Sequence, residues 1–283
     1  MSLSFSVPTP LEYFAALVRT DAEFHLCEAA ASLGQDEYPG LDVQQVLADI
    51  DALQARLRQR LPADASAMHR LRLLNHFFFQ DLHFGGNLNH YYDPDNSYLH
   101  RVLERRRGIP VSLAVLWLEL AQGLGLAAHG VGFPGHFLVK VNLPQAQVVI
   151  DPFTGESLSR EVLQARLEAW RGSHGLPGPI ELPLAHYLQA MPAREIMARM
   201  LRNLKEIHRT QSDWHRLVAV ENRLLVLLPQ AWDEYRDRGL AQAELGLLAP
   251  AVRDLETYLG QAGEGGDSRA IAERVAVLRR ALG

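Results

Sequence analysis

Cysteine is almost absent from this sequence, because Cys27 is the one cysteine among 283 residues. A disulfide framework and a thiolate metal cluster are therefore both excluded within one chain. Long apolar runs are absent as well, since no stretch reaches the roughly 18 residues of a membrane span. The first residues lack the basic start and the long apolar segment of a signal peptide. We therefore expect a cytoplasmic protein that does not enter a membrane.

An excess of positive charge is also missing. The formal net charge is -5 and the pI is about 6.2, so nothing indicates nucleic-acid binding. The basic run Arg105-Arg106-Arg107 is typical of a solvated patch, and holding an acidic partner segment is its alternative role. A hydrophobic fraction of 48% and a charged fraction of 22% are those of a globular protein. The length suggests about two domains.

Apolar residues recur at helical spacing through the first part of the chain. This spacing predicts helices over residues 9–33 and 41–61, and a third helix that Ser66 caps. The composition then changes in residues 84–99, FGGNLNHYYDPDNSYL, which are rich in Gly, Asn, Asp and aromatic residues. A loop of this length inside a compact domain is often functional.

The next helix, predicted from Pro110 to about Leu124, is apolar on nearly every face, which is typical of a buried helix. Three β-like runs follow it, AHGVGF, HFLVKVN and QVVIDPF, and the short segment LPQA joins the second to the third as a hairpin. SLSREVLQARLEAWR returns to a helical pattern, and a Gly- and Pro-rich linker is expected near residues 172–185. We expect residues 1–185 to form N-terminal helices plus an α+β core with a small antiparallel sheet.

A second, all-helical domain is expected over residues 190–283, where two windows 34 residues apart indicate tetratricopeptide repeats. In the second window Gly239, Ala251 and Leu255 occupy the small, small and large positions of a repeat. The first window matches more loosely, since Lys205 stands where the glycine would be. The end of the chain is expected to cap the repeats, and a generic helical bundle is the alternative.

Two polar residues stand at the ends of β-like runs. His136 follows a Pro-Gly turn in FPGHFLVK, and Asp151 ends VVID. In a hairpin centred between Leu143 and Ala146, the two side chains share a face as diagonal neighbours, whose backbones lie roughly 7–8 Å apart. A slip of one residue would put them on opposite faces. Phe137, Val139 and Val141 share one face in this register, so we expect the pair to meet at roughly 2.6–3.2 Å.

A carboxylate bonded to a histidine fixes its tautomer and stabilises the imidazolium, as in a catalytic triad. A structural His–Asp pair is the alternative. The nucleophile would be best placed at a helix N-terminus, where the dipole favours an anion. Ser112 is the first polar side chain of the helix that begins at Pro110. Its other interpretation is a small residue packed beside the core, with its hydroxyl bonded to a nearby carbonyl.

Four motifs in order resemble the transglutaminase-like, papain-related superfamily: DPDNSYLHRVLERRRGIPVSLAVLW, LGL, FPGHFLVKV and IDPFTGE. The stretch from Phe84 to Gly155 is most similar to the bacterial SirB-type proteins. That family also joins this domain to C-terminal tetratricopeptide-like helices, so the resemblance covers most of the chain. It implies an α+β core of the transglutaminase/papain type and an all-α repeat domain, and it leaves the activity open.

The resemblance implies a Cys–His–Asp triad, from which this chain departs at the cysteine. His136 and Asp151 match the histidine and the aspartate. Counting back from Leu124-Gly125 without gaps puts the family cysteine on Pro110, and a shift of two residues puts it on Ser112. Proline offers no nucleophile, and a serine lacks the ready ionisation of a thiol.

Asparagines recur in the long loop. We expect Asn87, Asn89 and Asn96 to hold it through side-chain-to-backbone bonds. Together with Pro110 they are also candidates to line a cleft beside His136.

Two further residue sets could carry chemistry. Cys27 lies on an apolar helical face and is more typical of a small buried hydrophobe than of a nucleophile. Four histidines lie in one aromatic-rich region: His76, His83, His90 and His100. They lack the carboxylate pattern of a known zinc motif, so we expect no metal and no cofactor.

Three functions follow from these patterns. The first is a pseudoenzyme that binds a peptide or protein segment in the former active-site cleft, with help from the repeats. The second is an active amide hydrolase or acyl transferase that uses Ser112, His136 and Asp151. The third is a scaffold in which the repeats alone bind. The missing cysteine disfavours the second, and the retained His–Asp pair disfavours the third, so the first is preferred.

Overall fold

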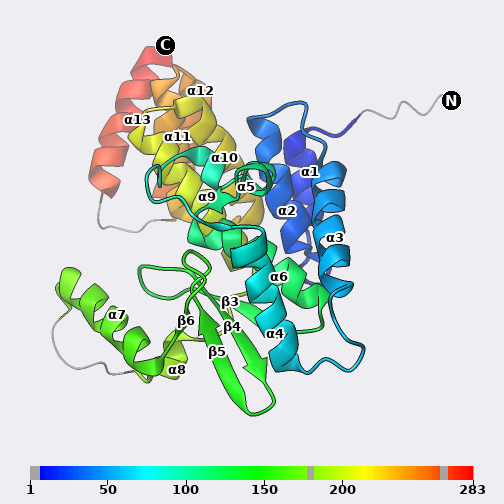
Figure 1. Ribbon diagram of the computed structural model, residues 1–283. Helices are drawn as coiled ribbons and strands as arrows, with labels where there is room; N and C mark the ends of the chain where they lie inside the picture. The colour runs from blue at the N-terminus through cyan, green and yellow to red at the C-terminus, as the bar shows by residue number, and fades with distance from the viewer. Residues whose placement is uncertain (1–6, 177–181, 262–266, 283) are drawn as a thin grey trace. The chain divides into compact units, whose positions relative to one another are not determined.

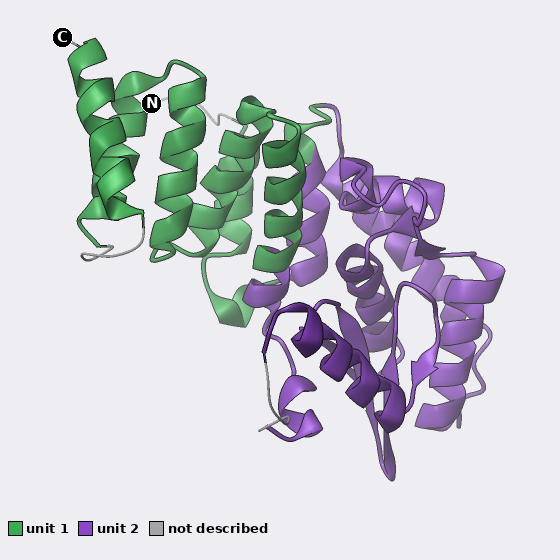
Figure 2. Ribbon diagram, turned by 90° about the vertical axis from the view of Figure 1, so that its left-hand side faces the viewer, with its two compact units in different colours: residues 1–24, 35–39, 198–283 green, residues 25–34, 40–197 purple. Residues whose placement is uncertain are grey.

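The structure is a computed structural model that describes residues 7–176, 182–261 and 267–282. The chain forms two compact units (Figure 2). The core unit comprises residues 25–34 and 40–197, and the repeat unit comprises residues 1–24, 35–39 and 198–283. Two N-terminal segments thus group with the repeats, a pairing that no sequence pattern indicates. The linker expected near residues 172–185 lies partly outside the described ranges.

The core unit combines helices with a small sheet (Figure 1). Its helical segments are α2 (Leu26–Ser32), α3 (Val43–Arg58), α4 (Ala67–Asn75), the π-helical η3 (His76–Asp81), η4 (Pro94–Asn96), α5 (Leu99–Arg105), α6 (Pro110–Gly123), α7 (Arg160–Ser173) and α8 (Leu184–Tyr187). Its strands are β1 (Gly85–Gly86), β2 (Arg107–Gly108), β3 (Ala127–Val131), β4 (Leu138–Leu143), β5 (Ala146–Ile150) and β6 (Ser157–Leu158). The predicted α+β class is confirmed.

Side-chain caps set where several helices begin. Asp42, Ser66 and Ser159 precede α3, α4 and α7, and each side chain accepts a hydrogen bond from a first-turn backbone N–H. These bonds satisfy donors that have no partner inside the helix. Pro110 is the first residue of α6, where its missing N–H leaves no bond unmade.

The four-stranded sheet is antiparallel and has the order β3-β4-β5-β6. In the β4–β5 hairpin, Val139 pairs with Ile150 and Leu143 pairs with Ala146. This register is the one predicted from the sequence. Because neighbouring side chains alternate between the faces, it fixes which strand residues meet which helix.

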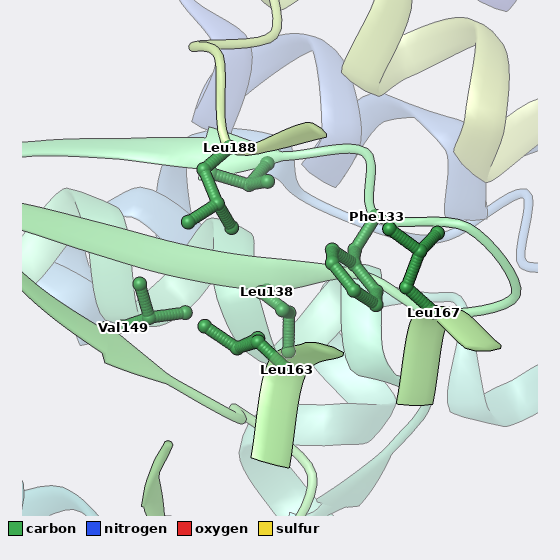
Figure 3. Close-up of a cluster of buried hydrophobic side chains, with 7 residues drawn as sticks. Phe133, Leu138, Val149, Leu163, Leu167 and Leu188 are labelled. Atoms are coloured by element: carbon green, nitrogen blue, oxygen red, sulfur yellow. The ribbon is translucent and has the colours of Figure 1, made fainter. Parts of the chain in front are cut away.

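The two faces of the sheet pack against different helices. One face carries a cluster with α7 and the residue after α8 (Figure 3): Val131, Phe133, Leu138, Val149, Leu163, Leu167 and Leu188. On the other face Val139 and Val141 are buried, and α6 packs against β3 and β4. Residues from Pro110 to Trp117 of α6 are all buried, so the helix predicted to be buried is buried.

The repeat unit is helical. Its segments are α1 (Pro10–Leu17), η1 (Asp21–Glu23), η2 (Leu33–Asp36), α9 (Ala193–Thr210), α10 (Trp214–Leu227), α11 (Trp232–Glu244), α12 (Leu248–Leu259) and α13 (Ser268–Leu282), where η2 and α9 each begin in the core unit. The α1 helix packs against α10. The guanidinium of buried Arg223 lies 5.0 Å from the ring centre of Phe14, and its Nε donates to Asp36 Oδ2 at 2.6 Å. These contacts explain why the first residues group with the repeats.

The prediction of a single helix over residues 9–33 is wrong, because α1, η1 and α2 are separate helical segments. The backbone is extended at Thr20 and again at Phe24. Thr20 donates its hydroxyl to Glu23 at 3.2 Å. Short polar side chains compete in this way with helical backbone bonds, which explains the break.

The second repeat has the close helix contact that its small residues predict. A Cβ built on Gly239 would lie 2.8 Å from Leu255 Cγ and 3.1 Å from the carbonyl oxygen of Ala251. In the first repeat, 34 residues earlier, Lys205 and Glu221 stand at the positions of Gly239 and Leu255. Lys205 Nζ lies 3.0 Å from Glu221 Oε1, so a polar contact replaces the small–large contact.

Among the helices within the described ranges, none has both the length and the apolar composition needed to cross a membrane.

Candidate functional site

A tight turn positions His136 just before β4. Pro134 and Gly135 are its central residues, and the His136 N–H donates to the Phe133 carbonyl at 3.0 Å. Gly135 has φ +71°, which glycine adopts without steric cost. Proline before such a glycine matches the preferences of a type II turn. The Pro-Gly pair therefore sets the direction in which the chain enters the strand.

A second turn positions Asp151 just after β5. The Asp151 N–H donates to the Glu156 carbonyl at 2.9 Å, and its own carbonyl accepts from the Gly155 N–H at 2.8 Å. The carboxylate accepts from the Phe153 N–H at 3.0 Å, as aspartates in turns often do. Asp151 is thus held by its backbone and by its side chain.

His136 and Asp151 meet as the hairpin register predicts. His136 Nε2 lies 2.8 Å from Asp151 Oδ1. The aspartate side chain is 2% exposed and the histidine is 26% exposed, so the imidazole is the part that solvent or a ligand reaches. Because an ionised carboxylate only accepts, Nε2 is the donor and the tautomer is fixed.

Arg166 of α7 is a third member of this group. Its Nη1 donates to Asp151 Oδ2 at 2.9 Å. Burial alone would raise the pKa of Asp151, but the hydrogen bonds from His136, Arg166 and the Phe153 N–H outweigh it, and the pKa lies below its ordinary value. The guanidinium of Arg166 therefore gives the buried carboxylate a permanent counter-ion. No sequence motif indicates Arg166.

The start of α6 holds no ionisable nucleophile. Pro110 is buried at its first position, and Ser112 is 0% exposed. The Ser112 hydroxyl donates to the Asn96 carbonyl at 2.6 Å and accepts from the Ile109 N–H at 3.2 Å. These are the bonds of a serine packed beside the core, as its alternative interpretation predicts. Its role as a nucleophile stays a prediction.

Asn96 and Asn87 hold the long loop. The Asn96 amide donates to the His90 carbonyl at 2.7 Å, and the Asn87 amide donates to Asn96 Oδ1 at 3.0 Å. Asn87 also accepts from the His90 N–H at 3.2 Å. Asn89 is exposed. The side-chain-to-backbone bonds predicted for this loop are therefore present at Asn87 and Asn96, and the cleft-lining role of the three asparagines stays a prediction.

Aromatic residues flank His136. The Phe153 ring lies edge-on to the imidazole with centres 6.5 Å apart, and the Tyr91 ring lies 6.1 Å from Phe153. Tyr92 packs on Tyr91 at 5.4 Å. Phe153 also meets the loop directly, because the Gly86 N–H donates to its carbonyl at 2.9 Å. We call Tyr91, Tyr92 and Phe153 the aromatic ledge.

The two tyrosines of the aromatic ledge are exposed to solvent. Tyr92 is 69% exposed, and Leu88 on the same loop is 80% exposed. Exposed aromatic side chains grouped beside a polar group are typical of a binding surface.

The basic run beside the loop is used inside the chain. Arg105 pairs with Asp93 at 2.9 Å and also with Asp95, both of the long loop. The Arg106 guanidinium lies 4.7 Å from the centre of the Phe84 ring, and Arg107 donates to the His83 carbonyl. Arg105 therefore pairs with the loop of its own chain, and a role of the run in holding an acidic partner segment stays a prediction.

The remaining candidates lie elsewhere. Cys27 is buried, and burial raises the pKa of its thiol far above the ordinary value. His76 lies 3.2 Å from Asp81, and His100 lines a pocket beside α3 and α5. Within the described ranges, one set of three side chains that could bind a metal lies close enough together to share an ion. It consists of Glu221, Glu234 and Asp237 of the repeats. The ammonium of Lys205 already pairs with all three.

Two family models match this chain. Residues 44–202 match the transglutaminase-like superfamily, and residues 204–276 match a tetratricopeptide repeat family. A UPF0162 protein of Xylella fastidiosa (strain Temecula1) is 37% identical over 240 residues, which cover 84% of each chain. UPF0162 protein PA3419 of Pseudomonas aeruginosa is 30% identical over 239 residues, covering 83% of each chain.

More distant proteins are also similar. UPF0162 protein YchA of Escherichia coli K12 is 28% identical over 252 residues, covering 86% of this chain and 90% of its own. A crystal structure of menin is similar over 94% of this chain and 73% of that one, with 12% identity and a TM-score of 0.40.

Proposed function

Because this chain belongs to the transglutaminase-like superfamily and ends in tetratricopeptide repeats, as its motifs predict, we propose that it is a binding protein rather than an enzyme. The surface around His136 binds a peptide or protein segment, and the repeats supply a second protein-binding surface. One observation carries this proposal: the His136–Asp151 pair is built and partly exposed, while the helix that would supply the nucleophile begins with buried Ile109 and Pro110.

Covalent catalysis needs a nucleophile with a general base within hydrogen-bond reach. The hydroxyl of Ser112 is bonded to the backbone of Asn96 and Ile109, and it has no exposed surface for a substrate to approach. Cys27 is buried, and its raised pKa keeps it a thiol. Neither residue suits an attack on an amide or an ester.

The same surface suits binding. Tyrosine offers a large contact area at a low entropy cost, and Tyr91 and Tyr92 are already packed on each other. His136 places one polar ring beside this apolar ledge, and Asp151 with Arg166 fixes the orientation of the ring. A segment with an aromatic or aliphatic side chain next to a polar group would match both parts.

A hydrolase or acyl transferase using Ser112, His136 and Asp151 is the second candidate, and the 2.8 Å His–Asp contact is the observation that favours it. A fluorophosphonate probe tests it directly. We expect no labelling of Ser112 in the wild type. Labelling of Ser112 that disappears in His136→Ala would establish the hydrolase instead.

Peptide selection on the full chain tests the binding function. Peptides from a random phage library are selected on the purified protein, and their affinities are measured by calorimetry. We expect His136→Ala and Tyr91→Ala each to weaken a selected peptide at least tenfold, about 1.4 kcal/mol. His69→Ala changes an exposed histidine of α4 and should have no effect. Peptides whose affinity is unchanged in both site variants would assign binding to the repeats alone.

A further inference from the structure

A pocket of about 320 Å³ lies in the core unit beside α3 and α5, and His136, Asp151 and the aromatic ledge are not among its lining residues. Its lining residues are Asp49, Ala52, Leu53, His100, Leu103, Glu104 and Arg106. This volume is at the lower end of the range for small-molecule sites. The pocket has no part in the function proposed for His136.

Arg106 gives the pocket a cationic group. It ends α5 in the left-handed conformation with φ +57°, which a non-glycine residue rarely adopts. Its guanidinium stacks on Phe84, and its Nη1 is buried without a hydrogen-bond acceptor. Within the described ranges no carboxylate lies within salt-bridge distance of it, whereas Arg105 beside it has two such partners. An added anion would supply this half-buried guanidinium with a hydrogen-bond acceptor and an opposite charge, and would therefore stabilise it.

Acidic groups also line the pocket. Asp49 is exposed on α3 and accepts from the Gln45 amide at 2.9 Å, and Glu104 is exposed on α5 and pairs with Arg101. Carboxylate oxygens such as these accept from ammonium groups. Burial lowers the pKa of His100, so its ring adds no further positive charge near neutral pH.

The wall of the pocket is apolar, since it contains Ala52, Leu53 and Leu103. The lining thus combines an unpaired guanidinium, carboxylates and an aliphatic surface. We propose that this pocket binds a small zwitterion of amino-acid size with an aliphatic side chain. Its carboxylate binds Arg106, its ammonium group binds Asp49 and Glu104, and its side chain contacts Leu53 and Leu103.

Calorimetry of the full-length protein with L-leucine tests this proposal. Two analogues of similar shape each lack one charge: 4-methylpentanoate lacks the amine, and isopentylamine lacks the carboxylate. We expect leucine to bind with a Kd in the millimolar range or below, and each analogue to bind at least tenfold more weakly. No binding of leucine at 10 mM, or equal binding of the three compounds, would overturn the proposal.

Variants place the binding in this pocket. Arg106→Gln should weaken leucine at least tenfold, whereas Arg72→Gln, on the exposed face of α4, should not change it. Arg106 also caps a helix, so Ala52→Phe provides a second test. Ala52 is exposed at the pocket wall, and a phenyl ring there should block binding without disturbing the fold. Leucine binding that survives Ala52→Phe would place the ligand elsewhere and refute this site.

Discussion

Trp170 of α7 lies where a side chain on Gly135 would begin, because a Cβ built there would be 2.8 Å from Trp170 Cδ1. Four residues earlier on the same helix, Arg166 donates to Asp151. Residues four apart share a helix face. One face of α7 therefore supports both the turn that precedes His136 and the carboxylate that His136 contacts.

Replacing Gly135 by alanine should destabilise the core unit. The left-handed backbone costs about 1–2 kcal/mol for a residue with a Cβ, and the contact with Trp170 adds to this. Gly175→Ala is a matched control, since Gly175 has φ +62° but nothing within 4 Å of its Cβ position. Urea denaturation should show a larger loss of unfolding free energy for Gly135→Ala. Equal losses would mean that Trp170 moves away freely.

Replacing Asp151 by asparagine should make the unfolding free energy less dependent on pH in the acid range. The pKa of Asp151 is lowered in the folded state, so its contribution is complete above its ordinary pKa near 4 and is lost as the pH falls through the folded value. At pH 7 we expect Asp151→Asn to lose about 1–3 kcal/mol of unfolding free energy, because Arg166 and His136 lose their acceptor charge.

The difference between wild type and Asp151→Asn should then shrink below pH 4 in denaturant titrations. Asp64→Asn, on the exposed surface, should follow the wild type at every pH. A difference that stays constant from pH 7 to pH 3 would show that the charge of Asp151 contributes nothing.

The hairpin half of the site could be predicted because local rules determine it. The Pro-Gly pair specifies the turn before His136, and the alternation along the two strands specifies the register that brings Asp151 to the same face. The placement of Ser112 followed in the same way from helical spacing, since its neighbours on that face are apolar.

The contacts that Arg166 and the long loop make with this hairpin could not be predicted, because they depend on how elements distant in the sequence pack together. Periodicity shows that one face of α7 is apolar, but not that Arg166 reaches the end of β5. The strands β1 and β2 have two residues each, too few for any period to appear. Their pairing brings Gly86 against Phe153, and this contact joins the long loop to the turn that holds Asp151.

Overpacking the second repeat tests the register of the repeats. Ala251 is fully buried on α12, where its backbone approaches Gly239. Ala251→Phe should therefore cost roughly 1–3 kcal/mol of unfolding free energy. Ala249→Phe introduces the same ring two residues away, at an exposed position of α12, and should cost far less. A neutral Ala251→Phe in chemical denaturation would contradict the close contact of α11 with α12.

The Lys205–Glu221 pair of the first repeat makes a further prediction about pH. Glu221 is fully buried, and burial raises its pKa to about 8 despite the neighbouring Lys205. Between its ordinary pKa near 4.5 and pH 8, the folded state therefore holds a proton that the unfolded state has released. Stability should fall as the pH rises through this window. Lys205 has a raised pKa, so its own contribution is lost only at more alkaline pH.

Glu221→Gln removes this titration and keeps the shape of the side chain. Between pH 5 and pH 8.5, the unfolding free energy of the wild type should fall by roughly 1 kcal/mol or more relative to that of Glu221→Gln, since one pKa unit corresponds to about 1.4 kcal/mol. Glu206→Gln alters an exposed pair with Arg209 on α9 and should follow the wild-type curve. Guanidinium denaturation across this range measures all three proteins. Parallel curves for wild type and Glu221→Gln would contradict this prediction. They would show that Lys205 keeps Glu221 ionised throughout, so that a permanent ion pair occupies the positions of the glycine and leucine of the second repeat.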